Sequence, residues 1–397
     1  RIRPAPAAAP GEVAVWARPR EDGSARPGTI CCRRGCVVDE FDFSAVSGPA
    51  DGNRALFRDL GGPALAASAF GGVHETLFAY GQTGSGKTHT IFGSAGEEGL
   101  LELFVRACFH QAEACPGSAI HVCCYEILGD ALTDLVDPRS LIELGALHTE
   151  DVVSDALFVK TRLCRYQIVR VLRAETCLDL LREARARRTE GASSCNPSSS
   201  RSHAVVQLFV QNSAGAPRHR GPVGGPQGTL GVLTLVDLAG SEREQENPSA
   251  EGRRAARLLN TSLSSLNRLL RKLQAGSLDE SERRQSVLTR CLWEYLRPGC
   301  GIAMVFCVSP LARHCSSTLS TLAMAAESRQ IRSQRKSHYV PILAQGQPSS
   351  PQGNVQTALS QSRRSARPSL PPPPPPEAGR APLPLGARGG TPEGATA

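Results

Sequence analysis

The fold of this chain is decided by one stretch of sequence, Gly81-Gln-Thr-Gly-Ser-Gly-Lys-Thr88, which follows a short apolar run at residues 76–80. The stretch fits the pattern GxxxxGK[ST], whose glycines let backbone N–H groups curl around phosphate oxygens without Cβ clashes. A helix that follows such a loop points the positive end of its dipole at the same phosphates. We therefore expect a nucleotide whose phosphates are held by Gly81, Gln82, Thr83, Gly84, Ser85, Gly86, Lys87 and Thr88, with the Thr88 hydroxyl on Mg²⁺.

Apolar runs elsewhere in the chain predict the rest of the sheet. Buried strands are expected at residues 119–127, 204–210, 229–236 and 302–308. Apolar residues recur at helical spacing in residues 100–110, 177–188 and 258–273. Because strands alternate with helices, we predict an α/β fold of the P-loop NTPase class, in which a central, mostly parallel sheet carries helices on both faces. Exposed loops are predicted at residues 212–228 and 275–282.

Length and composition narrow the class of protein. The chain has 397 residues, of which 40% are hydrophobic and 21% charged, as in a soluble globular protein. No run approaches the roughly 18 apolar residues that a membrane-spanning helix needs, so no membrane span is expected. The 14 cysteines form no CxxC pair and have no His partners at zinc-ligand spacing, which is typical of reduced thiols in a cytosolic protein. No nucleic-acid partner is expected.

The end of the chain differs from the rest. Residues 345–353 are rich in Pro, Gln and Ser, residues 371–376 are all proline, and basic residues far outnumber acidic ones after residue 331. We predict a folded domain at residues 1–331 and a disordered, basic, Pro-rich tail at 332–397. No apolar heptad pattern follows the domain, so no dimerising coiled coil is predicted. Because the chain begins with Arg1 and not Met, we expect that an upstream segment is missing.

Two further segments have the composition of sensors for a terminal phosphate. Asp237-Leu-Ala-Gly-Ser-Glu242 directly follows a predicted strand, and Gly240 can offer its N–H to the γ-phosphate and act as a hinge. Asn196-Pro-Ser-Ser-Ser-Arg-Ser-His203 gathers hydroxyls, an amide and an imidazole that can orient a water and a metal. Taken alone, the first is compatible with a capped turn and the second with a polar linker. Together with the phosphate loop they predict a nucleotide switch.

These residues resemble the kinesin motor domain family. Residues 79–90 are similar to the kinesin phosphate loop almost residue for residue. Residues 196–203 match its switch I pattern N-x-x-S-S-R-S-H, and residues 237–242 match its switch II pattern D-L-A-G-S-E. Weaker similarities extend over residues 1 to about 331. The resemblance implies the kinesin motor fold, ATP and Mg²⁺ as ligands, microtubules (tubulin) as partner, an unknown cargo, and a cytoplasmic location on the cytoskeleton.

The resemblance also implies roles for single residues of the switches. Thr88 and Ser200 would surround Mg²⁺, with Asp237 reaching it through water, and Asn196 would contact the nucleotide. Ser199 and Ser200 would position the attacking water, while Gly240 senses the γ-phosphate. Arg201 and Glu242 would pair across that phosphate, and Glu242 would take the proton of the water.

The adenine side offers two matches to the family's R-x-R-P. Arg1-Ile-Arg-Pro4 fits fully, whereas Trp16-Ala-Arg-Pro19 lacks the first arginine. The first match also leaves more room for a hairpin before residues 41–43, so we prefer it. The adenine site would then be lined by Arg1, Arg3, Pro4 and His89, and the domain would begin inside its first strand.

The similarity to the family is weaker on the side that would face the microtubule. The chain is shorter between Gly252 and Asn260, Val287 stands where Lys is usual, Arg283 where Tyr is usual, and Met324 where an aromatic is usual. Basic residues remain there: Arg253, Arg254, Arg257, Arg268, Arg271, Lys272, Arg283, Arg284 and Arg290. We favour a microtubule-stimulated motor ATPase. The alternatives are a kinesin-like microtubule-binding or nucleotide-switch module with weak or no motility, and another P-loop class such as a GTPase, against which the switches and the lack of NKxD argue.

Overall fold

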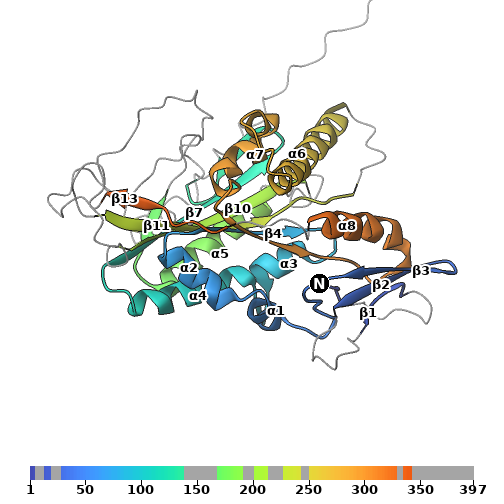
Figure 1. The fold of residues 1–397 in the computed structure, drawn as a ribbon, viewed down its shortest axis with the longest axis horizontal. Coiled ribbons are helices and arrows are strands. Elements are labelled where there is room, and N and C mark those ends of the chain that lie inside the picture. The colour runs from blue at the N-terminus through green and yellow to red at the C-terminus, as the bar shows by residue number, and fades with distance from the viewer. Residues whose placement is uncertain are drawn as a thin grey trace, which may run out of the picture.

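The structure is a computed structural model that describes residues 1–4, 13–18, 28–137, 168–190, 201–212, 227–242, 250–328 and 334–341. An eight-stranded sheet forms its centre (Figure 1). The order β12-β4-β11-β10-β7-β8 runs across it, with β13 beside β11 and β9 beside β7. The strands are β4 (His74–Tyr80), β7 (Ser118–Leu128), β8 (Ala131–Asp134), β9 (Val169–Val171), β10 (His203–Asn212), β11 (Gln227–Asp237), β12 (Gly301–Phe306) and β13 (Tyr339–Pro341).

The sheet is mixed, which corrects the expected predominance of parallel pairing. Only β12, β4 and β11 run parallel to one another. The strand β10 pairs antiparallel with both β11 and β7, and β7 pairs antiparallel with β8 and β9. Chain connectivity explains the pairing of β7 with β8, because these strands are joined by a tight turn at Gly129, and strands joined by a short turn must run antiparallel. All the strands predicted from apolar runs are present.

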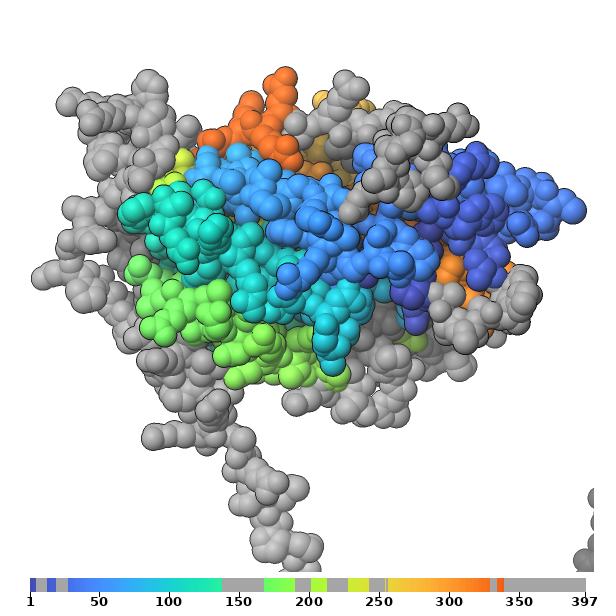
Figure 2. All heavy atoms as spheres, turned by 90° about the horizontal axis from the view of Figure 1, so that it is seen from below, coloured from blue at the N-terminus to red at the C-terminus, as the bar shows by residue number. Residues whose placement is uncertain are grey.

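Helices cover both faces of the sheet, as predicted (Figure 1). One face carries α1 (Asn53–Asp59), α2 (Gly62–Phe70), α3 (Lys87–Phe92), α4 (Leu100–Glu113) and α5 (Ala174–Glu190). The other face carries α6 (Ala250–Gln274), α7 (Val287–Leu292) and α8 (Cys315–Ser328). Seen from below, α1, α2, α4 and α5 form a continuous layer (Figure 2). None of the helices in the described ranges is long and apolar enough to cross a membrane.

Two hydrophobic clusters follow from this layering, one on each face of the sheet. Every residue of β4 is buried, because helices lie above and below it. On α6, the leucines that the sequence places on one stripe are buried, and Leu269 beside them is buried as well. The stripe consists of Leu259, Leu263, Leu266, Leu270 and Leu273. Burial of this seam fixes which side of α6 turns outward.

A smaller, three-stranded sheet lies beside the main one. It consists of β1 (Val15–Arg18), β2 (Thr29–Arg34) and β3 (Val37–Asp42), all antiparallel. The hairpin expected before residues 41–43 is therefore present. The remaining elements are the short pair β5 (Gly93–Ser94) and β6 (Glu97–Glu98) and the 3-10 turns η2 (Glu282–Gln285), η3 (Trp293–Tyr295) and η4 (Ala312–His314).

The folded region extends beyond residue 331, where we had predicted its end. Residues 334–341 lie along the main sheet, because β13 pairs with β11 and Lys336 N donates to Gly299 O at 2.9 Å. The Arg335 guanidinium pairs with Glu75 at 2.7 Å, and the rings of His338 and His74 stack at 3.9 Å. Glu75 is buried, and a buried carboxylate requires a cation or a hydrogen bond, which explains why this basic segment packs there. The rest of the predicted tail lies outside the described residues.

Candidate nucleotide site

The phosphate loop leaves the end of β4 and leads directly into α3. Gly81, Gly84 and Gly86 have φ values of +149°, +75° and +100°, which L side chains rarely adopt. A side chain at position 81 would also collide with the carbonyl oxygen of Cys307. Only glycine can thus adopt the positive φ values of this loop and also allow the backbone at position 81 to lie against Cys307.

Lys87 is folded over the loop that precedes it. Its Nζ donates to the Gln82 carbonyl oxygen at 2.9 Å, and the side chain is almost fully buried. Burial lowers the pKa of Lys87, while the carboxylates of Asp237 and Glu242 act in the opposite direction. A cation held in this way is placed to meet an anion on the loop.

Switch II lies against the phosphate loop. Leu238 N donates to Ala79 O at 3.3 Å, and Ser241 N donates to Gly81 O at 3.1 Å. Asp237 ends β11 and accepts a hydrogen bond from the Thr88 hydroxyl at 2.8 Å. Two of the three residues predicted to serve Mg²⁺, Thr88 and Asp237, are therefore in direct contact.

The Glu242 carboxylate is bound by the phosphate loop itself. Thr83 N donates to Glu242 Oε2 at 2.7 Å. A side chain at Gly240 would collide with the Thr83 hydroxyl and with the Glu242 carboxylate, so this approach needs glycine. The amides of the loop thus attract an anionic oxygen in this structure.

Arg188 is a site residue that the sequence analysis missed. It lies near the end of α5 with a side chain only 4% exposed, and its guanidinium donates to Asp237 Oδ2 at 2.7 Å and to Ser202 O at 3.0 Å. It also lies 3.4 Å from the carboxylate of Glu126. An aspartate at the end of an apolar strand indicates that a buried cation will pair with it. The sequence alone does not show which cation this is, because α5 carries several arginines.

His203 connects three elements behind the site. Ala239 N donates to its Nδ1 at 3.1 Å, and its Nε2 lies 2.8 Å from the Ser262 hydroxyl on α6. Because Ser262 donates to Leu259 O at 2.7 Å, Nε2 carries the proton and the imidazole is neutral. Burial lowers the pKa of His203 to about 3, with smaller contributions from Arg188 and Lys87. The ring joins switch II to α6.

Switch I is described only in part. Asn196, Ser199 and Ser200 lie outside the described residues. Arg201 is half-buried directly before β10. Its pairing with Glu242 and the roles of the three other residues stay predictions.

The residues predicted for the adenine side lie next to the phosphate loop. Arg1–Pro4 run beside the end of β12, where Val308 N donates to Arg1 O and Arg3 N donates to Val308 O, both at 3.0 Å. The Arg1 guanidinium donates to the Thr90 hydroxyl at 2.9 Å, and Arg3 donates to Gly84 O. His89 pairs with Glu97 at 3.2 Å, and Pro4 is exposed. Adenine binding by these residues stays a prediction.

The residues present fit a nucleotide with a divalent cation. Several buried side-chain oxygens of the described residues have no hydrogen-bond partner. Some lie away from the phosphate loop, such as Asp39 Oδ2 and Asn267 Oδ1, and three others are Gln82 Oε1, Ser85 Oγ and Asp237 Oδ1. All three belong to the phosphate loop or to the strand end beside it. Buried polar atoms in native proteins are normally paired, so this grouping fits a polar ligand.

Comparison with known proteins decides the family. The model of the kinesin motor domain matches residues 30–331. This chain belongs to the kinesin motor domain family. It is 30% identical over 298 residues to the kinesin-like protein KIN-7E, chloroplastic, of Oryza sativa subsp. japonica, an alignment that covers 73% of this chain and 24% of that protein. It is 28% identical over 308 residues to human kinesin-like protein KIF18B, covering 76% of this chain and 34% of that protein.

Solved kinesin structures have the same fold. The structure of a fast kinesin superposes with a TM-score of 0.69 at 23% identity, covering 85% of this chain and 92% of that one. The KIF14 dimer in complex with a microtubule superposes with a TM-score of 0.67 at 24% identity, covering 84% and 94%. The alignments span only 24% and 34% of the length of the two curated relatives named above.

Within the kinesin motor domain, two departures from the family pattern are core positions. Val287 and Met324 are buried in the cluster between α6, α7 and the sheet. Arg283 is buried as well, and its guanidinium donates to Glu280 at 2.6 Å. Where the family pattern has a lysine, Val287 therefore contributes an apolar side chain to the core and no charge to the surface. The match begins at residue 30, so it does not include Arg1–Pro4.

Proposed function

We propose that this kinesin motor domain hydrolyses ATP and couples hydrolysis to force or movement on microtubules. The observation that carries the proposal is the contact of switch II with the phosphate loop, in which Thr83 N donates to Glu242 and Thr88 donates to Asp237. An NTPase requires a sensor that can reach the terminal phosphate, and this sensor is within hydrogen-bond distance of the loop.

The chain's own residues would bind the triphosphate by charge and by backbone amides. Lys87, the loop N–H groups and the N-terminus of α3 would bind the phosphates. Thr88, Ser200 and Asp237 would hold Mg²⁺, which when bound neutralises charge on the β- and γ-oxygens. Asn196, with Arg1, Arg3, Pro4 and His89 on the adenine side, would complete the site.

Catalysis would depend on positioning and on one proton acceptor. Ser199 and Ser200 would orient the attacking water, and the Glu242 carboxylate would take its proton directly or through a second water. Arg201 would pair with Glu242 and close the site, while Gly240 supplies an N–H and the freedom to hinge. Because Glu242 now binds Thr83 N, closure would require this carboxylate to exchange partners.

Coupling to the microtubule would use the link from switch II to α6. A displacement of Ala239 would shift His203 through their hydrogen bond, and His203 would in turn shift Ser262 on α6. Both hydrogen bonds are buried, so breaking one without replacement costs about 1–3 kcal/mol. A shift of switch II would therefore be passed to the helix that carries the basic residues.

The test is phosphate release from ATP and from GTP, with and without microtubules. A motor should release phosphate from ATP in preference to GTP and be stimulated by microtubules by at least an order of magnitude. Binding to microtubules without stimulation would instead support a nucleotide-switch module. A preference for GTP would contradict the proposed ATPase.

A further inference from the structure

The outward side of α6 carries a basic stripe, defined by Arg254, Arg257, Arg268, Arg271 and Lys272. At about 100° of rotation per residue, these positions fall within an arc of about 100°. The buried leucine seam of the same helix is centred roughly opposite to that arc. The stripe therefore faces away from the core, on the face of the molecule that also carries α7 (Figure 1).

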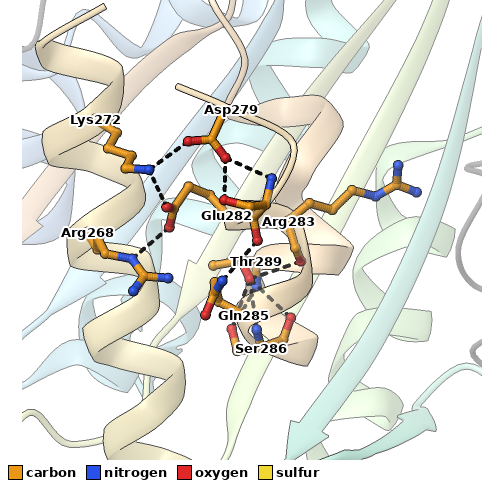
Figure 3. Close-up of polar contacts among 9 residues, drawn as sticks. Arg268, Lys272, Asp279, Glu282, Arg283, Gln285, Ser286 and Thr289 are labelled. Atoms are coloured by element: carbon orange, nitrogen blue, oxygen red, sulfur yellow. Dashed lines mark hydrogen bonds and ion pairs between the residues drawn. The ribbon is translucent and has the colours of Figure 1, made fainter. Parts of the chain in front are cut away.

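Two of the five cations of the basic stripe are neutralised by two carboxylates that follow the helix. Arg268 Nε lies 2.7 Å from Glu282 Oε2, and Lys272 Nζ lies 2.7 Å from Glu282 Oε1. Lys272 Nζ also lies 2.6 Å from Asp279 Oδ2. The close-up shows Asp279 and Glu282 meeting these two cations between α6 and η2 (Figure 3). We name Asp279 and Glu282 the carboxylate clamp.

The carboxylate clamp is anchored in the fold. The Glu282 side chain is only 3% exposed, although we had predicted residues 275–282 to be an exposed loop throughout. Asp279 accepts a hydrogen bond from Ser281 N at 2.9 Å, which fixes the turn that presents it. Hydrogen bonds from Lys272 and Ser281 lower the pKa of Asp279 to about 2. Burial alone would raise the pKa of Glu282, but Lys272 and Arg268 outweigh it and lower it, so both acids are ionised at neutral pH.

The other three cations of the stripe differ from one another in their partners. Arg254 and Arg257 are exposed and form no ion pair with any carboxylate of the described residues. Arg271, in contrast, pairs with Glu327 of α8 at 2.9 Å. The charge of the stripe is therefore available at its N-terminal end and compensated at its C-terminal end.

We propose that the carboxylate clamp limits the affinity of this face for an acidic filament surface, leaving the N-terminal half of the basic stripe to carry the attraction. The proposal rests on the proposed function, because the acidic partner is the microtubule. A filament carboxylate that approaches Arg268 or Lys272 must displace an internal carboxylate that is already in place. The clamp thus sets the strength of binding without being part of the nucleotide site.

The experiment compares D279N/E282Q with the wild-type chain in microtubule co-sedimentation over a series of salt concentrations. Asn and Gln keep the shape and one acceptor oxygen each, and remove both negative charges. We expect affinity to rise about three- to tenfold at low ionic strength, because two cations become available, and the gain to shrink as salt is added. Should E282Q prevent folding, D279N alone is the variant to use, because Asp279 is half-exposed and its gain should be about twofold.

The matched control is E113Q/E175Q, which removes two exposed carboxylates from α4 and α5 on the opposite face. A rise in affinity in the control equal to that of D279N/E282Q would overturn the proposal, because net charge alone would explain it. So would wild-type affinity in D279N/E282Q. If no variant, including the wild-type chain, binds microtubules in any nucleotide state, the proposed function fails together with the clamp.

A second comparison uses two arginines of the same stripe. R257A removes a cation that has no ion-pair partner among the described residues, and R271A removes one that Glu327 already neutralises. The proposal expects R257A to weaken microtubule binding several-fold and R271A to change it by less than about twofold. Equal losses would contradict a division of the stripe into available and compensated halves.

Discussion

The phosphate-loop region and the outward side of α6 both contain many charged residues, but they hold them differently. In the first, Asp237 and Arg188 are 1% and 4% exposed and are fixed by partners from several elements. On α6, Arg271 and Glu327 are 61% and 52% exposed and form a single contact. Buried charges must stay paired, whereas exposed pairs contribute little and can exchange partners. The buried pairs near the phosphate loop are therefore held more rigidly than the exposed pairs on the outward side of α6.

The largest effect is expected where the nucleotide side performs chemistry. Replacing Glu242 with alanine removes the proposed proton acceptor, so steady-state phosphate release should fall about 10²- to 10⁴-fold while ATP still binds. The matched control is Glu113→Ala, which removes an exposed carboxylate on α4 and should leave phosphate release unchanged. Unchanged turnover in Glu242→Ala would refute the assignment of this residue.

The second effect tests whether the nucleotide side is rigid because its charges are buried. Arg188→Met leaves Asp237 without its cation and should lower the free energy of unfolding by about 3–5 kcal/mol, measured by denaturant titration. Arg182→Met on the same helix, where the side chain is 61% exposed, should cost less than about 1 kcal/mol. Similar losses for the two variants would remove the contrast between buried and exposed arginines.

The third prediction concerns acid stability. Burial lowers the pKa of His203 and of His74 to about 3 and that of His121 to about 4. These imidazoles stay neutral in the folded state, whereas in the unfolded state they bind protons near pH 6.5. Above that pH the histidines therefore do not reduce the free energy of unfolding. It should fall as pH drops from about 6.5 toward 3, by about 1.4 kcal/mol per pH unit for each histidine. His203→Gln should reduce this slope in denaturation measured between pH 6.5 and 4.5, and an unchanged slope would show that His203 does not contribute.

The smallest effect is expected at an ion pair near the end of the described chain, in which Arg335 is half-exposed and Glu75 is buried. Arg335→Ala removes the cation, but Glu75 keeps the hydrogen bond from the Ser68 hydroxyl at 2.7 Å, and because Arg335 is 52% exposed the loss should be about 1 kcal/mol or less. Hydrogen exchange of the β13 amides should become faster, since these few pairings are locally stable only when the segment is anchored. The control is Lys336→Ala, in the same segment and with no ion pair among the described residues, which should leave exchange unchanged.

Much of the fold could be predicted because its signals are local. Apolar runs located the main strands, and the leucine spacing located the buried seam of α6. The glycines of the phosphate loop predicted a backbone that can curl around phosphates without Cβ clashes, and Gly84 and Gly86 have positive φ values in the structure. The direction of strand pairing was harder to predict, since an apolar run looks the same in parallel and antiparallel neighbours.

The errors and omissions share a different cause. Arg188 was missed because α5 offers several arginines and only packing selects the one that reaches Asp237. Residues 334–341 were assigned to the tail because a basic segment with few apolar residues shows no tendency of its own to fold. They pack because Glu75 provides an ion-pair partner and the first residues of β11 provide backbone pairing partners. Glu282 was expected in an exposed loop and is buried because two cations on α6 surround it.

The sequence by itself determined the chemistry available to this protein: a phosphate loop, two switch motifs, and a helix with leucines on one side and cations on the other. These follow from neighbours in the chain, whose spacing is fixed by covalent geometry. Only the tertiary structure decided which charges are paired, because ion pairs such as Arg188–Asp237 and Lys272–Glu282 join residues from different elements. Their strength depends on burial, which is a property of the packed molecule and not of the chain.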